Sequence, residues 1–104
     1  MDVIIKSDEG RTYVSIDGRV DTVSVKEFNK KVEPLKEGEN PNIVIDCTRL
    51  SYVSSSGLRA FLTLQKSVLS RGGKMVLTAL QPYVKEVFDI TGFSSIFTIE
   101  ETAK

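Results

Sequence analysis

The sequence contains no histidine and only one cysteine. The lack of histidine removes the commonest general base and the commonest zinc ligand, so neither a Ser–His hydrolase nor a histidine-based zinc site is expected. The single thiol, Cys47, cannot form an internal disulfide and has no histidine to activate it. Because Cys47 closes the apolar run NIVIDC, we expect it to be a small buried side chain.

The sequence also lacks long apolar runs and a net charge. No run is long enough to span a bilayer, and MDVIIKSDEG at the start lacks the basic and hydrophobic regions of a signal peptide. Fourteen basic residues balance fourteen acidic ones, so no net field attracts nucleic acid or an anionic membrane. We therefore expect one cytoplasmic domain over residues 1–104, with neither nucleic acid nor membrane as a direct partner.

Short apolar runs predict five strands. The first two runs form a hairpin, in which Gly18 ends or bends the second strand. The continuous β-branched run Ile43–Ile45 is typical of a strand buried on both faces. The predicted strands comprise residues 3–6, 11–20, 41–47, 74–80 and 95–100.

Three amphipathic stretches between these runs predict helices. The first carries an apolar stripe at Val25, Phe28, Val32 and Leu35. Asp21 or Thr22 is its expected N-cap, Gly38 lies near its expected end, and Pro34 predicts a kink or an early stop.

The second helix follows the serines at 54–56 and ends at the glycines 72–73. Its expected core face consists of Leu58, Phe61, Leu62, Val68 and Leu69. Leu64 lies off that face, so the helix could be apolar on more than one side. Leu64 could support docking, although a single leucine on the surface needs no further explanation. The third helix begins near Pro82 and ends near Gly92.

The resulting order is β-β-α-β-α-β-α-β. Strands that alternate with helices require parallel pairing with right-handed crossovers, and the opening hairpin adds an antiparallel edge. The sequence therefore predicts a small α/β domain with helices packed on a mixed, mostly parallel sheet.

Three consecutive serines, Ser54, Ser55 and Ser56, stand where a strand leads through an irregular stretch into the second helix. In open α/β sheets, sites form where the carboxyl ends of strands meet helix N-termini. The serines should therefore lie at the functional edge, with Asp21, which follows the second strand, as a neighbour. Asp46 is expected to end the strand before them.

Several roles for the serines compete. Ser55 or Ser56 can cap the helix by accepting a backbone N–H bond. A nucleophile is poorly supported, because Val53 precedes the serines and no histidine activates them. The GGK stretch at 72–74 joins a helix to a strand, which is the wrong polarity for a phosphate-binding loop.

Modification of a serine agrees better with the absence of catalytic residues. A phosphate at a helix N-terminus is held by free N–H groups and by the positive end of the helix dipole. It would add nearly two negative charges to an exposed turn, and a partner docked there would lose affinity.

The whole chain resembles a STAS domain of the bacterial anti-sigma factor antagonist family. The resemblance rests on GRVDTVSVKEF at 18–28, IDCTRLSYVSSSGLRAFL at 45–62 and GKMVLTALQPYVKEVFDITGFSSIF at 73–97. It implies a protein that is not an enzyme and needs no cofactor. Such a protein binds an anti-sigma factor that is also a serine kinase, and so frees a sigma factor. Phosphorylation of the first serine in the Asp-Ser-Ser/Thr-Gly motif breaks the complex, and a serine phosphatase reverses it.

Matched by position, the resemblance makes Ser55 the expected phosphoacceptor, with Ser54 and Ser56 as alternatives. The partner surface that it implies comprises Asp21, Thr22, Ser54, Ser56, Gly57, Leu58 and Arg59. Asp21 is compatible with both capping and partner contact, and Arg59 is either a partner contact or a solvated charge.

One departure from the family motif matters, because Ser54 stands where the family has aspartate. The loss of that charge keeps a second hypothesis open, namely an unphosphorylated STAS scaffold in a transporter or signalling assembly. A receiver-like phosphoacceptor would need clustered acidic residues at strand ends, and only Asp46 is suitably placed.

Overall fold

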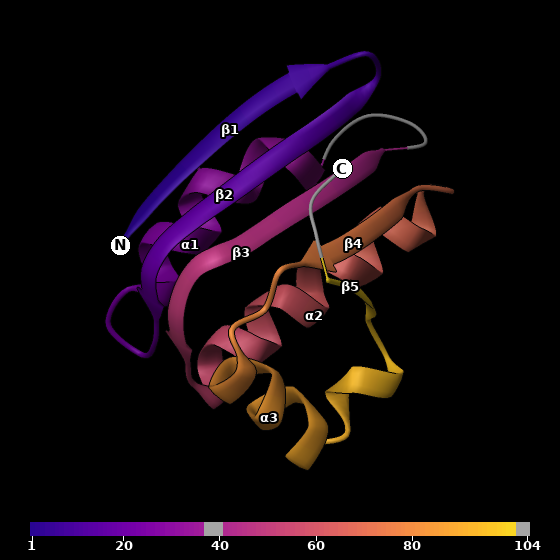
Figure 1. Cartoon of the computed structure of the whole chain (residues 1–104). Coiled ribbons are helices and arrows are strands. Elements are labelled where there is room, and N and C mark those ends of the chain that lie inside the picture. Colours follow the sequence, from indigo (N-terminus) through magenta and orange to yellow (C-terminus); the bar gives the residue numbers. More distant parts are fainter. Residues whose placement is uncertain (37–40, 102–104) are drawn as a thin grey trace.

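The computed structural model describes residues 1–36 and 41–101 (Figure 1). Five strands form one sheet in the order β1-β2-β3-β4-β5. β1 is antiparallel to β2, and the remaining neighbours are parallel. The strands are Asp2–Asp8, Arg11–Val20, Asn42–Val53, Lys74–Thr78 and Thr98–Glu100. The predicted mixed, mostly parallel sheet is therefore confirmed.

A helix joins each pair of consecutive parallel strands. These helices are α1 (Val25–Val32), α2 (Ser55–Ser70) and α3 (Pro82–Ile90), with 3-10 turns at Glu33–Lys36 and Phe93–Ser95. Each crossover moves one strand further in the same direction, so right-handed connections bring the helices to one face of the sheet. Figure 1 shows α1 and α2 behind the sheet. None of the helices in the described ranges is both long and apolar enough to cross a membrane.

Aromatic rings connect the helices across the core. Phe28 of α1 meets Phe61 of α2 edge to face at 5.2 Å between ring centroids. Phe61 stacks on Phe88 of α3 at 6.4 Å, and Phe88 meets Phe97 at 5.6 Å. The first three rings are fully buried and Phe97 is nearly so, so this run of rings links the three helices through the core.

The predicted strand-face alternation is confirmed in β2. Val14 and Ile16 are completely buried against the helices, while Asp17 on the other face is exposed. Gly18 bends β2 rather than ending it, because its φ of +107° lies in the region that favours glycine. The pairing with β3 shifts register on both sides of this bend.

The boundaries predicted for β3 and β5 need correction. β3 continues to Val53 because its second half pairs with β2 as far as Val20, so the stretch before the serines is not irregular and Asp46 lies within the strand. β5 is shorter than predicted, since Phe93–Ser95 forms a 3-10 turn. α1 ends at Val32, in agreement with the effect predicted for Pro34. The predicted stop at Gly38 lies outside the described residues.

The predicted core face of α2 was partly wrong. Leu69, which was predicted to lie in the core face, is 55% exposed, whereas Leu64 is fully buried. Phe61, Leu64 and Val68 form the buried stripe, because α2 packs against the sheet on one side and α1 on another. Leu64 is therefore a core residue rather than a surface leucine.

Candidate functional site

The serine turn joins the end of β3 directly to α2 and is fixed to the end of β2. The Ser54 amide donates to the Val20 carbonyl oxygen at 3.0 Å, and Val20 and Val53 are paired across the two parallel strands. Asp21 and Ser54 directly follow this pair, each at the end of one of two neighbouring strands. The prediction that Asp21 lies beside the serines is confirmed.

Each of the three serines has a different environment. Ser54 is the N-cap of α2, and its hydroxyl accepts a hydrogen bond of 3.2 Å from the Gly57 amide. This corrects the expectation that Ser55 or Ser56 caps the helix, because the helix begins one residue earlier. Ser55 is exposed and Ser56 is half-buried. Neither of these two hydroxyls forms a hydrogen bond with a described residue.

Two residues of the predicted partner surface are buried. A Cβ atom on Gly57 would lie 2.5 Å from the Val20 carbonyl oxygen and 2.7 Å from a methyl carbon of Val53. Leu58 is 3% exposed and belongs to the core. Their burial gives Gly57 and Leu58 the role of seating the first turn of α2. Contact of these two residues with a partner stays a prediction.

Asp21 organises the turn that follows β2. Its Oδ1 accepts hydrogen bonds from the amides of Val23 at 3.1 Å and Ser24 at 3.0 Å. Its Oδ2 accepts a 3.2 Å bond from Arg19 Nε. The Ser24 hydroxyl donates to the Arg19 carbonyl at 2.6 Å and accepts from the Asp21 amide at 3.0 Å. The result is a closed set of hydrogen bonds that holds the turn.

These bonds stabilise the ionised carboxylate. Chiefly the Ser24 amide, with smaller contributions from Arg19 and Val23, lowers the pKa of Asp21 to about 2. The predicted N-cap is displaced, because α1 starts at Val25 and its N-cap is Ser24. Asp21 caps the preceding turn instead, and the Thr22 side chain is exposed.

An exposed aromatic strip next to the turns was missed by the sequence prediction. The guanidinium carbon of Arg19 lies 4.5 Å from the ring centroid of Tyr52, and Tyr52 meets Tyr83 of α3 at 6.4 Å. Tyr83 is 48% exposed and Val23, in the Asp21 turn, is 86% exposed. A tyrosine within a continuous β-strand is the available signal, but the predicted strand stops at residue 47, before Tyr52.

Arg59 lies one helical turn after Ser55 and is exposed. Together with Ser56, Asn29 and Lys36 it lines a shallow hollow of about 300 Å³ between α1 and α2. Arg59 and Lys36, which pairs with Glu33 at 3.4 Å, thus line the same hollow as Ser56.

Cys47 and Asp46 have structural roles. Cys47 is completely buried, as predicted, and burial raises the pKa of its thiol to about 12, with a further contribution from the Asp46 charge. Asp46 accepts hydrogen bonds from the Thr48 hydroxyl and amide at 2.6 and 3.0 Å. Within the described ranges, no group of three or more acidic or cysteine side chains is arranged to hold a metal ion.

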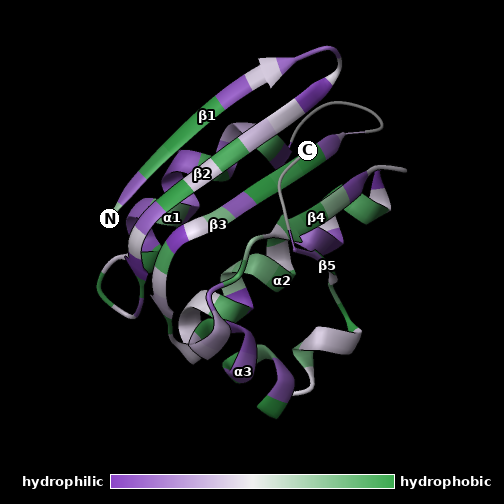
Figure 2. Ribbon diagram, in the orientation of Figure 1, coloured by the Kyte–Doolittle hydropathy of each residue, from purple (hydrophilic) through white to green (hydrophobic). Residues whose placement is uncertain are grey.

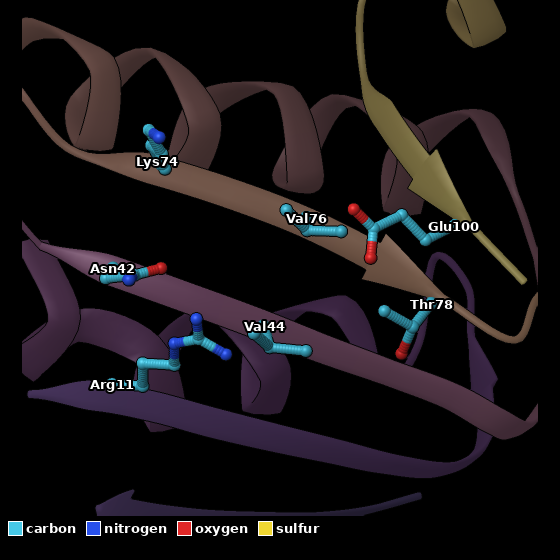
Figure 3. A pocket seen from close by; sticks show the side chains of 7 residues that line it. All are labelled: Arg11, Asn42, Val44, Lys74, Val76, Thr78 and Glu100. Atoms are coloured by element: carbon cyan, nitrogen blue, oxygen red, sulfur yellow. The ribbon is translucent and has the colours of Figure 1, made fainter. Parts of the chain in front are cut away.

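A separate hollow of about 320 Å³ lies on the sheet face opposite the helices (Figure 3). Arg11, Asn42 and Lys74, the first residues of β2, β3 and β4, line it together with Val44 and other side chains. None of the serine-turn residues lines it, so it is distinct from the site at the carboxyl ends of the strands.

Fold and site together define a small α/β domain with a polar surface where two neighbouring strands end. The family model of the STAS domain matches residues 2–104. The anti-sigma-B factor antagonist of Bacillus subtilis is 32% identical over 99 residues, which cover 95% of this chain and 90% of that protein. BtrV of Bordetella bronchiseptica is 33% identical over 91 residues, covering 88% and 78%. The chain belongs to the STAS domain family and groups with its anti-sigma factor antagonists.

The fold agrees with solved structures. A STAS domain protein from Planctomyces limnophilus superimposes with a TM-score of 0.90 at 18% identity, covering 99% of this chain and 92% of that one. SpoIIAA in its phosphorylated form gives a TM-score of 0.74 at 19% identity, covering 97% and 92%. These likenesses support the arrangement of strands and helices described above.

Proposed function

We propose that this chain is a cytoplasmic anti-sigma factor antagonist whose Ser55 hydroxyl is its reversible phosphoacceptor. One observation carries the choice of residue: Ser55 alone among the three serines is exposed, and its hydroxyl has no partner among the described residues. The Ser54 hydroxyl is engaged as a cap, and Ser56 is half-buried beside α1. A kinase reaches Ser55 without opening the helix.

The partner is an anti-sigma factor with serine kinase activity, and its binding releases a sigma factor. The proposed contact surface joins the exposed parts of the two turns, namely Thr22, Val23 and Ser55, to the strip of Arg19 and Tyr83. Exposed aromatic and arginine side chains are the types that dominate binding energy at interfaces. Relatives named anti-sigma-B factor antagonists support this class of partner.

A phosphate on Ser55 would change the charge of this surface without dismantling the fold. Ser55 is the first residue of α2, where the helix dipole favours negative charge. The new charge of nearly −2 would stand next to the ionised Asp21 turn and would repel an acidic partner surface. A serine phosphatase would restore the uncharged turn and binding.

Ser54 replaces the aspartate of the family motif without loss of the cap. Serine and aspartate are among the preferred N-cap residues, and the Ser54 hydroxyl forms the bond to Gly57 that a carboxylate oxygen would form. What the replacement removes is one negative charge beside the acceptor. We therefore expect phosphorylation to survive, with altered kinase recognition.

The test is incubation of the purified chain with ATP, magnesium and candidate anti-sigma kinases of the host, followed by intact-mass and peptide mass spectrometry. One added phosphate on residues 54–56 that disappears in Ser55→Ala supports the proposal. Persistence in Ser55→Ala but not in Ser56→Ala would move the acceptor to Ser56. Partner binding with no phosphate from any kinase would favour the unphosphorylated scaffold.

A further inference from the structure

The two edges of the sheet differ in length and regularity. β5 contributes only Thr98–Glu100 at one edge. β1 contributes seven residues at the other edge and keeps one unbroken register with β2 from Asp2 to Asp8. No described strand pairs with the outer side of β1. Such a strand presents a row of backbone donors and acceptors to another chain.

The side chains of β1 are unusually apolar for an exposed edge, as the hydrophobic stretch in Figure 2 shows. Ile4 is 56% exposed and Ile5 is 37% exposed. Val3 and Ile5 lie on the helix side, because they pair with the buried Ile16 and Val14. Asp2, Ile4 and Lys6 alternate with them and share the opposite face.

We propose that β1 pairs antiparallel with β1 of a second copy of this chain, around a two-fold axis at Ile4. In this register Ile4 faces its own counterpart, and Val3 faces Ile5 of the other copy. Asp2 faces Lys6 of the other copy on each side of the axis, which gives two cross-strand pairs of opposite charge. The apolar residues and the charges are both matched.

The neighbouring registers lack this complementarity. A two-fold axis at Ile5 would place Asp2 opposite Asp8, and an axis at Lys6 would place two lysines opposite each other. An axis at Val3 would place Asp2 opposite Ile4. A register shifted by a single residue is excluded, because it would place the helix-side residues of one copy opposite residues that lie on the other face in the second copy. The Ile4 register is therefore favoured by the sequence of the strand itself.

The paired sheets would leave the serine turns free. The serine turn follows β3, and β2 separates β3 from the pairing edge. Because the two copies run antiparallel, their functional edges would point in opposite directions, and each copy could bind its own partner. A contact made by one strand per copy lies at the small end of specific interfaces, so we expect a weak dimer.

Sedimentation equilibrium of the full chain from about 10 µM to about 1 mM tests the dimer. The wild-type chain should show a reversible monomer–dimer equilibrium. Lys6→Glu should raise the dissociation constant about tenfold, because both attractive pairs become repulsive. Asp2→Lys combined with Lys6→Glu should return the dissociation constant to within about twofold of wild type, since each pair is again attractive with its two charges exchanged. Lys66→Glu on the exposed side of α2 is the matched charge control and should leave it unchanged.

The double variant Asp2→Lys, Lys6→Glu distinguishes a broken interface from a damaged fold. Its dissociation constant returns towards the wild-type value only if residues 2 and 6 of the two copies are paired. Hydrogen exchange gives a second measurement, in which β1 amides should become more protected as the concentration of the wild-type chain rises. A monomer across the whole concentration range would overturn the proposal. A dimer that forms equally well with Lys6→Glu would overturn the register.

Discussion

The Ser54 amide donates a 3.0 Å hydrogen bond to the Val20 carbonyl oxygen, which fastens the start of α2 to the end of β2. The same carbonyl lies where a Cβ atom on Gly57 would have to fit. Since Asp21 follows Val20 directly, one contact positions both the serine turn and the Asp21 turn. The two turns form a single surface, and changes at their shared base should affect both.

Gly57→Ala should destabilise the chain by about 2–3 kcal/mol, because the added methyl group meets the Val20 backbone and cannot be relieved by a side-chain rotation. Urea unfolding measures the loss. Gly10→Ala is the matched control: a Cβ atom there meets nothing within 4 Å, and only its φ of +81° is unfavourable, at about 1 kcal/mol. Equal losses in the two variants would mean that the close contact at Gly57 is relieved without cost.

Ser54→Ala should cost about 1 kcal/mol in unfolding free energy, because the Gly57 amide loses its capping acceptor. Ser54→Asp should keep the cap and the stability, while it restores the charge found in the family motif. Ser55→Ala is the control and should change stability little, since the exposed hydroxyl bonds no described residue. Chemical denaturation of the three variants under the same conditions ranks them by their free energies of unfolding. A larger loss in Ser55→Ala than in Ser54→Ala would contradict the cap assignment.

The sequence predicted the element order and the approach of Asp21 to the serines, because apolar periodicity and parallel topology determine both. It failed at Thr48–Val53, where polar residues interrupt the apolar pattern and strand structure depends on pairing with β2. Because of that error, Tyr52 was not predicted to lie in a strand, and the N-cap of α2 was expected at Ser55 or Ser56 instead of Ser54. The position of Leu64 off the main stripe of α2 indicated that this helix could be apolar on more than one side, and the packing of α2 against both the sheet and α1 is what buries Leu64.

Cys47 should not react with thiol reagents in the folded protein. It is completely buried, and burial raises the pKa of its thiol to about 12, so almost no thiolate forms near neutral pH. The rate of labelling with a chromogenic disulfide at pH 8 should follow global unfolding and increase sharply in urea. Rapid labelling without denaturant would mean that β3 opens locally around Cys47.

The contribution of Asp21 to stability should depend on pH in a defined window. Its pKa is lowered to about 2 in the folded chain, below the value of about 3.9 expected when unfolded. The ionised form is thus favoured by folding: its stabilisation is complete above pH 4 and is lost as the pH falls towards 2. Asp21→Asn retains an oxygen acceptor for the Val23 and Ser24 amides but removes the charge.

Urea midpoints of wild type and Asp21→Asn measured between about pH 6 and about pH 2.5 test this assignment. Wild type should be the more stable at pH 6, and the difference should shrink below pH 4 as Asp21 takes up a proton. A difference that stays constant down to pH 2.5 would show that the amide disturbs the turn by its shape. In that case the charge of Asp21 would not be what holds the turn after β2.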